Sequence, residues 1–277
     1  YVVDFYRKIH KPLKNFWDYQ LYIILFPKLI AGPIVRYHEI SDQITDRSHN
    51  DTFDNRLTGF LRFCLGLGKK VLIANTVGEF ADTIFGTSPE LINTATIWIG
   101  LLAYTFQIYF DFSGYSDMAI GLGLMLGFKF PENFNNPYIS QSISEFWRRW
   151  HMTLGNWMKN YLYIPLGGNR VSVSRLYFNL AFVFVISGFW HGAAWNFIAW
   201  GAFHGMFLIA DRLFLEKILQ KSGKFISILF TFFTVMIGWL LFRVESMDHF
   251  ASLFVKMFAF DFHPDSFFVN QKVMITL

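Results

Sequence analysis

The longest stretch without Asp, Glu, Lys or Arg is LYFNLAFVFVISGFWHGAAWNFIAWGAFHGMFLIA, residues Leu176–Ala210. A helix rises ~1.5 Å per residue, so a single helix over this stretch would be ~52 Å long. The hydrocarbon core of a bilayer is only ~30 Å thick and is crossed by ~20 residues. The stretch therefore predicts a membrane segment that breaks or turns, and Gly188, Gly192 and Gly201 are the places where we expect this.

The composition of the whole chain also indicates a membrane protein. Hydrophobic residues make up 53% of the chain and charged residues 16%, whereas ~25% of residues are charged in an average soluble domain. Aromatic residues reach 20%, with 35 Phe, and lipid-facing or interfacial surface accommodates them more readily than a soluble core does. Leu91–Phe110 and Phe225–Phe242 are further charge-free stretches of span length. We expect an all-α, polytopic membrane fold.

Two other apolar stretches are interrupted. Tyr19–Val35 contains Lys28 and two prolines, and Leu57–Ala74 contains one Arg and two Lys. Irregular backbone at membrane depth needs protein or water around it, so we expect re-entrant, interfacial or bundle-buried segments here. The chain ends within the apolar run Val273–Leu277. We expect residues 1–277 to form a single membrane-embedded domain that belongs to a longer chain.

The positive charge is concentrated in Lys129–Arg175. This segment holds six of the Lys and Arg residues against two Glu, an excess equal to the +4 of the whole chain. Basic segments beside membrane spans tend to stay in the cytoplasm. The charge either only orients the chain or also attracts anionic lipid headgroups or a phosphate-bearing substrate.

Within the basic segment, we expect a helix that is too polar to cross a membrane. Ser144 is its predicted N-cap, and the helix is expected to run to about Tyr161. It would lie at the interface or line a cavity. Glu145 precedes Arg148 and Arg149 by three and four positions, so a local ion pair is expected.

His191 is the most conspicuous ionisable residue, because it lies in the middle of the charge-free stretch, within Ser187–Gly192. An ionisable group at membrane depth is a functional candidate. Imidazole titrates near neutrality, which suits a general base that removes a hydroxyl proton. The alternative is a buried histidine that forms a hydrogen bond to a neighbouring helix.

His151 lies forty residues earlier and therefore on a different element. Two histidines that converge from separate elements would supply a base and a carbonyl polariser or proton relay. Considered alone, a histidine in the position of His151 is more often a residue of the membrane interface. His204 follows His191 by thirteen positions, which places it on another helix face, so we assign it a structural role.

Asp111 and Asp117 follow the stretch that ends at Phe110. If the helix continues, both carboxylates are buried and need partners, for which we expect Arg148, Arg149 or a histidine. Alternatively, the span ends at Asp111. Farther along, Pro165–Arg170 has two adjacent glycines, and their backbone amides beside an arginine would hold a phosphate. An ordinary turn is the competing interpretation.

Several motifs are missing from the sequence. A single cysteine, Cys64, excludes an internal disulfide and a cysteine metal cluster. The sequence lacks the HExxH, CxxC, P-loop and dinucleotide-binding motifs, so zinc, ATP and NAD chemistry have no support. It also lacks a GxSxG elbow, which argues against a serine acyl-enzyme.

Five segments together resemble the bacterial membrane-bound O-acyltransferase family, and in particular its alginate O-acetylation branch. They are Phe26–Arg36, Asp111–Asp117, Phe146–His151, Tyr161–Arg170 and Phe189–Gly192. The D-alanyl transferases of teichoic acid modification are more distant relatives. The resemblance implies a ring of tilted transmembrane helices around a central tunnel, with interfacial and re-entrant helices.

By this resemblance, His191 matches the catalytic histidine and His151 the second histidine of the family. The resemblance implies transfer of an acetyl group from a cytoplasmic thioester, acetyl-CoA, for O-acetylation of an extracellular or periplasmic polysaccharide. It also implies a multi-pass location in the bacterial cytoplasmic (inner) membrane and a periplasmic, hydrolase-like partner. Neither a metal nor nucleic acid is expected. The expected supporting residues are Asp111, Asp117, Glu145 and Trp190, and the expected donor-binding residues are Arg148, Arg149, Asn169 and Arg170.

Two other functions stay open. One is transfer of D-alanyl or another acyl group to a cell-wall polymer. The other is a transporter without chemistry, which broken spans and buried ionisable groups also suit. A transporter is expected to show repeat-related halves, and we find no internal repeat.

Overall fold

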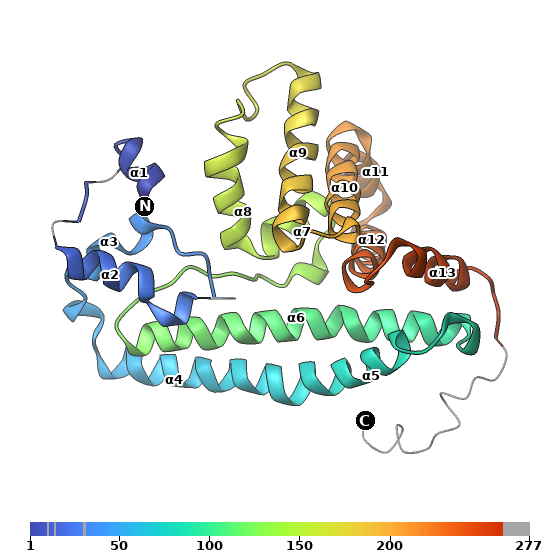
Figure 1. Cartoon of the computed structure of the whole chain (residues 1–277), viewed down its shortest axis with the longest axis horizontal. Helices are drawn as coiled ribbons and strands as arrows, with labels where there is room; N and C mark the ends of the chain where they lie inside the picture. Colours follow the sequence, from blue (N-terminus) through green and yellow to red (C-terminus); the bar gives the residue numbers. More distant parts are fainter. Residues whose placement is uncertain (10, 14, 30–31, 263–277) are drawn as a thin grey trace.

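The computed structural model describes residues 1–9, 11–13, 15–29 and 32–262, and over these ranges all regular secondary structure is helical. This confirms the all-α prediction. Two groups of helices dominate the fold (Figure 1). One is a long hairpin that lies along the lower side of the view, and the other is a set of helices that stand across it. The apolar run Val273–Leu277 lies outside the described residues.

The hairpin consists of two long antiparallel rods (Figure 1). The first rod joins three helices end to end, and the second is one helix. The first contains α4 (Phe53–Gly68), the π-helical turn η3 (Lys69–Ala74) and α5 (Asn75–Phe85), and the second is α6 (Thr94–Met125). Both rods begin at a capping side chain, since Thr52 accepts a hydrogen bond from the Asn55 amide and Asn93 from the Thr96 amide.

Facing glycines bring the two rods into backbone contact. A Cβ atom on Gly59 would lie 2.6 Å from the Gly121 carbonyl oxygen, and one on Gly114 would lie 2.7 Å from that of Gly66. Small residues allow helices to approach this closely. Gly59 and Gly66 of α4 are seven residues apart, and so are Gly114 and Gly121 of α6. Seven residues make almost two helical turns, so the two glycines of each helix lie on the same face of that helix. The stretch Leu57–Ala74 therefore lies in one rod of a helical hairpin, buried against α6 at its glycines while most of its large apolar side chains are exposed.

The charge-free stretch folds as two helices, as its length predicted. They are α9 (Val173–His191) and α10 (Trp195–Ala210), and the chain turns between them at Gly192. Gly188 and Gly201, which we also expected as break points, lie inside the helices instead. A Cβ on either would collide with a carbonyl group of the facing helix, so these glycines serve close packing of α9 against α10.

Three helices of the described chain are long and apolar enough to cross a membrane. They are α9, α10 together with its continuation η7 (Asp211–Leu215) and α11 (Glu216–Ser222), and α12 (Lys224–Arg243). In the first two, only 28% of the apolar window is buried inside the chain. Apolar helices with so much uncovered surface belong in lipid or against further helices. The chain is a membrane protein.

The helix over Leu91–Phe110 is not one of these three candidates. Its Thr, Tyr and Gln residues dilute the hydropathy of the charge-free stretch, and α6 continues beyond it to Met125. The alternative that the segment ends at Asp111 is therefore wrong. The main core lies where α6, α10 and α12 meet the basic segment Lys129–Arg175. It is built around Leu101, Phe146, Trp200 and Trp239.

The remaining helices cover the two ends of the hairpin. The stretch Tyr19–Val35 is interrupted as expected, because α2 ends at Ile24 and extended backbone precedes α3. The shorter elements are α1 (Val2–Tyr6), α2 (Phe16–Ile24), η1 (Phe26–Lys28), α3 (Tyr37–Thr45), η2 (Ser48–Asn50), η4 (Pro89–Leu91), η5 (Pro137–Ile139) and α13 (Met247–Met257).

Candidate active site

The expected helix from Ser144 to Tyr161 is broken in the middle. The structure has α7 (Ile143–Arg149), α8 (Met152–Met158) and the π-helical turn η6 (Lys159–Tyr163). The N-cap is Ser142 instead of Ser144, since its hydroxyl accepts a hydrogen bond of 3.1 Å from the Glu145 amide. Between α7 and α8, Trp150 is extended and His151 is left-handed, with φ 45° and ψ 51°.

The loop after α6 stabilises this break. The Asn135 amide donates to the Arg149 carbonyl oxygen at 2.9 Å, and the Met152 amide donates to the Asn133 carbonyl oxygen at 2.9 Å. The loop thus pairs with backbone groups that the interrupted helix leaves open. A left-handed conformation at a residue other than glycine costs about 1–3 kcal/mol and is concentrated at functional sites. The break makes His151 a stronger candidate than its sequence position did.

The imidazole of His151 is buried and has one defined polar partner. Its Nδ1 lies 3.0 Å from Oδ1 of Asn133, and its ring packs edge-to-face on Phe112 with centroids 4.7 Å apart. Burial, and to a lesser extent the charge of His191, lower the pKa of His151 to about 3. The His151 ring is therefore neutral near pH 7.

His191 is the last residue of α9 before the turn at Gly192. Its half-buried ring packs edge-to-face against Trp200 and Phe242, with centroid distances of 5.3 Å in both cases. No described residue forms a hydrogen bond with it. The alternative that His191 is a structural histidine bonded to a neighbouring helix therefore lacks its hydrogen bond. Trp190 packs on the His191 ring at 4.9 Å and is 56% exposed.

A cavity of about 510 Å³ lies between α7, α8 and α9, and His151 is one of its lining residues. This volume is within the ~300–1,000 Å³ typical of small-molecule sites. Most of the lining is apolar, from side chains that include Trp147, Leu154 and Val183. Ser187, one turn before His191 in α9, also lines it. A site of this kind accepts an apolar group beside an imidazole.

The structure separates the two adjacent arginines. Arg149 forms the local ion pair expected with Glu145, at 2.8 Å, and also donates to the Asn135 carbonyl oxygen. Arg148 lines the cavity, is exposed, and has no acidic partner among the described side chains. Arg149 thus helps to hold the loop, whereas Arg148 is free to meet a ligand.

The loop Pro165–Arg170 is a tight turn with left-handed Gly167 and Gly168. The Asn169 side-chain oxygen accepts a hydrogen bond of 2.6 Å from the Tyr163 hydroxyl. Tyr163 lines the cavity, but neither Asn169 nor Arg170 is among its lining residues. The turn is therefore connected to the cavity by the hydrogen bond between Asn169 and Tyr163.

Asp111 and Asp117 find their partners in the other rod of the hairpin. Asp111 pairs with Lys70, and Asp117 pairs with Lys69 at 2.6 Å and Arg62 at 2.9 Å. The expectation of Arg148, Arg149 or a histidine as partner is wrong. The reason is the close contact of the two rods at their glycines, which places Arg62, Lys69 and Lys70 directly beside the carboxylates of α6.

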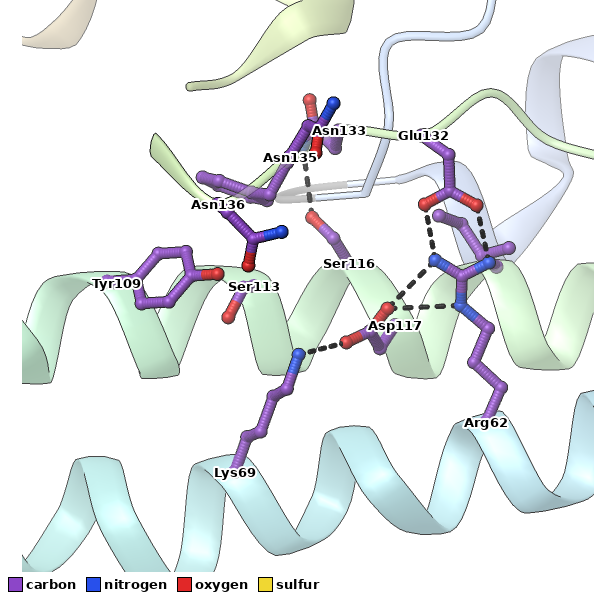
Figure 2. Close-up of a pocket in the computed structure, with 12 residues that line it drawn as sticks. Arg62, Lys69, Tyr109, Ser113, Ser116, Asp117, Glu132, Asn133, Asn135 and Asn136 are labelled. Carbon is purple, nitrogen blue, oxygen red and sulfur yellow. Dashed lines mark hydrogen bonds and ion pairs between the residues drawn. The ribbon is translucent and has the colours of Figure 1, made fainter. Parts of the chain in front are cut away.

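A second, polar pocket of about 170 Å³ is lined by Asp117 and its partners Arg62 and Lys69. Figure 2 shows Arg62 between Asp117 and Glu132, and Lys69 pointing at the other oxygen of Asp117. Asn133 lies at the upper edge of this pocket and donates to the Ser116 hydroxyl at 3.0 Å (Figure 2). Asn133 lines this pocket and His151 lines the apolar cavity, so the hydrogen bond between them connects the walls of the two.

His204 is fully buried and contacts Trp147 and Trp200. It is the third histidine of the region, and neither ring nitrogen has a hydrogen-bond partner among the described residues. It lines neither the apolar cavity nor the polar pocket. Over the same part of the chain, no group of three or more His, Cys, Asp or Glu side chains is placed to hold a metal ion.

Three apolar helices define an integral membrane protein, and the buried imidazole of His151 on the wall of an apolar cavity marks its candidate active site. A sequence profile described as the membrane-bound O-acyltransferase family matches residues 8–241, so the chain belongs to that family.

Several curated proteins are similar to this chain. It is 47% identical over 260 residues to the probable alginate O-acetylase AlgI of Azotobacter vinelandii, which covers 94% of this chain and 51% of that protein. The peptidoglycan O-acetyltransferase of Helicobacter pylori is 45% identical over 240 residues, 85% of this chain and 45% of the relative. The teichoic acid D-alanyltransferase of Bacillus subtilis is 31% identical over 249 residues, which cover 82% of this chain and 61% of the relative. The chain spans about half the length of the alginate relatives it matches.

Proposed function

We propose that this chain is the central part of a membrane O-acetyltransferase, which uses acetyl-CoA to acetylate hydroxyl groups of an extracellular or periplasmic polysaccharide. The observation that carries the proposal is the buried imidazole of His151 on the wall of the apolar cavity, to which α9 contributes Ser187, one turn before His191. The similarity to the O-acetylase of Azotobacter and the O-acetyltransferase of Helicobacter supports the same reaction.

In the proposed reaction, His191 acts as general base. It takes the proton of the acceptor hydroxyl, whose oxygen attacks the thioester carbonyl carbon. A C–O bond forms, the C–S bond breaks, and the leaving thiolate of coenzyme A receives the proton. His191 suits this role because no described residue occupies its ring nitrogens, and because the aromatic rings of Trp200 and Phe242 shield it from water.

His151 is better suited to relaying the proton than to polarising the carbonyl. A polariser must donate a hydrogen bond to the carbonyl oxygen. The Nδ1 of His151 already lies against an acceptor, Oδ1 of Asn133, so the neutral ring has its single proton there. Its Nε2 then carries a lone pair that accepts a proton.

Arg148 is the proposed contact for the phosphates of the donor, because it is the arginine that lines the cavity without an acidic partner. Asn169 and Arg170 would act only at the mouth, beside Tyr163. Arg149 and Glu145 support the loop that holds His151. Asp111 and Asp117 support the hairpin, and Trp190 supports the ring of His191.

We place this chain in the bacterial inner membrane as part of a multi-pass ring of helices around a tunnel. The residues of the relatives beyond the matched half would supply further helices. A periplasmic, hydrolase-like partner would receive the acetyl group or complete its transfer to the polymer. The similarity to a D-alanyltransferase supports a second candidate, D-alanyl transfer, at lower identity.

The test is transfer of labelled acetyl from acetyl-CoA in membranes that carry the full-length protein, with His191→Gln at matched expression. We expect the variant to lose transfer by ~10²–10⁴-fold, as is typical for loss of a general base. His204→Gln is the matched control, because it also replaces a buried histidine of the same helix bundle. An equal loss in both variants would mean that His191 matters for packing alone. Transfer of D-alanyl but not acetyl would favour the second candidate, and no transfer with any donor would favour the transporter.

A further inference from the structure

We propose that Asn133 is a positioning residue, whose side-chain oxygen fixes His151 in the Nδ1–H tautomer and so leaves Nε2 as the proton-accepting nitrogen at the cavity. This inference rests on the proposed role of His151. The hydrogen bond of 3.0 Å between His151 Nδ1 and Asn133 Oδ1 is the observation from which it starts. Asn133 itself is 1% exposed.

The orientation of the Asn133 amide is fixed by its other partners. The Thr153 amide donates to Oδ1 at 3.3 Å and the Thr153 hydroxyl does so at 2.9 Å. A backbone N–H donates and cannot accept, so the atom that faces it is the oxygen. The amide nitrogen of Asn133 points the other way and donates to the Ser116 hydroxyl. Because an amide oxygen only accepts, Nδ1 of His151 must carry the proton.

Asn133 connects three segments that are far apart in the sequence. Through Ser116 it holds α6, and through its own backbone and side chain it holds the start of α8. The Thr153 hydroxyl in turn accepts a hydrogen bond of 3.0 Å from the Ile34 amide. The ring of His151 is thus held in one orientation by a buried polar network, and such a network favours a single arrangement.

The tautomer has a consequence for the reaction. With Nδ1–H held by Asn133, the lone pair of Nε2 is available to a proton that leaves the acceptor hydroxyl or His191. The opposite tautomer would place N–H at the cavity, where it donates but does not accept. Loss of the Asn133 oxygen would leave both tautomers populated, and only one of them relays the proton.

The test compares three variants of the full-length protein in membranes by the pH dependence of acetyl transfer. Asn133→Ala removes the acceptor, and we expect transfer to fall by ~10–100-fold, as for other residues that orient a functional histidine. Asn133→Asp restores an acceptor oxygen, so we expect it to recover most of this loss. Its negative charge also raises the pKa of His151, and the acid limb of the profile therefore moves to higher pH.

Asn179→Ala is the matched control. Asn179 is also fully buried and donates one hydrogen bond, 3.0 Å to the Leu166 carbonyl oxygen, but it forms no hydrogen bond with a histidine among the described residues. We expect this variant to share the loss of thermal stability and to keep the wild-type pH profile. The ionisable groups around Asn133 and His151 are His191, which acts on the charge of His151, then Arg148, Lys159 and Tyr163 in the apolar cavity, and Arg62, Lys69, Tyr109, Asp117 and Glu132 in the polar pocket. All variants retain them.

A double variant distinguishes failure of this inference from failure of the proposed function. His151→Gly removes the ring at a left-handed position that glycine tolerates. If Asn133 acts through His151, Asn133→Ala adds nothing to the loss caused by His151→Gly. Additive losses, or an unshifted profile in Asn133→Asp, would overturn the positioning role while leaving His151 catalytic. Full activity of His151→Gly alone would instead overturn the proposed relay.

Discussion

The hairpin of α4 to α6 and the upright unit of α9, α10 and α12 handle ionisable groups in opposite ways. In the hairpin, Asp111 and Asp117 pair with Lys and Arg side chains of the facing rod. In the upright unit, His191 and His204 have no hydrogen-bond partner among the described residues. Charges with satisfied partners stabilise a fold, whereas groups left open are available for chemistry. Mutations in the hairpin should therefore mainly lower stability, and mutations of the open groups should mainly lower the rate of transfer.

The largest effect is expected at His151, which belongs to neither region and links them through Asn133. His151→Gly should reduce acetyl transfer by ~10²–10⁴-fold, because it removes a proton-relaying group. Thermal stability should fall by less than is usual for the loss of a buried ring, since glycine adopts the left-handed backbone without strain and so offsets part of the lost packing. Added imidazole can enter the space that the ring leaves, and partial recovery of transfer would identify the ring as the missing group. A large loss of stability without recovery by imidazole would assign His151 to the fold.

The next effect separates stability from chemistry in the hairpin. Gly114→Leu places a side chain against the backbone of Gly66 and should destabilise the protein by about 1–3 kcal/mol or more. The rate per folded molecule should stay the same. Thermal unfolding in detergent measures the loss of stability. Acetyl transfer divided by the amount of folded protein measures the rate per folded molecule. Gly68→Ala is the matched control: nothing lies within 4 Å of its new Cβ, so a gain of ~0.5–1 kcal/mol is expected.

A smaller effect tests the ion pairs themselves. Asp117→Asn leaves Lys69 and Arg62 without their shared carboxylate and should cost about 1–3 kcal/mol of stability. Asp82→Asn removes a pair with Arg243 in which the carboxylate is 69% exposed, and a change below about 1 kcal/mol is expected there. Equal shifts of the melting temperature in the two variants would show that burial does not distinguish these pairs.

The smallest effect concerns the donor. Arg148→Gln should raise the KM for acetyl-CoA by about fivefold with kcat unchanged, the value of one exposed charge contact of ~1 kcal/mol. Arg149→Gln should leave this KM alone and lower stability, because Arg149 pairs with Glu145 and the loop. The reverse result would exchange the roles of the two arginines.

Much of the helical architecture could be predicted from the sequence. The length of the charge-free stretch Leu176–Ala210 predicted that the helix breaks or turns. The chain turns at Gly192, which was one of the three places where a break was expected. The pairing of Asp111 and Asp117 was predicted wrongly, although a pattern for it exists. Gly59 and Gly66 have the same seven-residue spacing as Gly114 and Gly121, and this spacing predicts a close antiparallel pair of helices.

The break at His151 and the contact with Asn133 could not be predicted. Nothing in Phe146–His151 indicates a chain reversal, because no glycine or proline marks the left-handed position. The break exists because a loop eighteen residues earlier supplies its hydrogen bonds, which is a tertiary effect. Asn133 lies between Glu132 and Phe134 in an ordinary polar loop, so sequence reasoning had no reason to select it.

The paired glycines of the hairpin also restrict how its length can change. Inserting one residue between Gly114 and Gly121 would turn the far part of α6 by ~100° and take Gly121 out of line with Gly59. Inserting seven residues turns it by only ~20° from its former direction. Deletions and insertions in this hairpin should therefore be tolerated in steps of seven, made in both rods at once, and selection from a library of random-length inserts should recover that period.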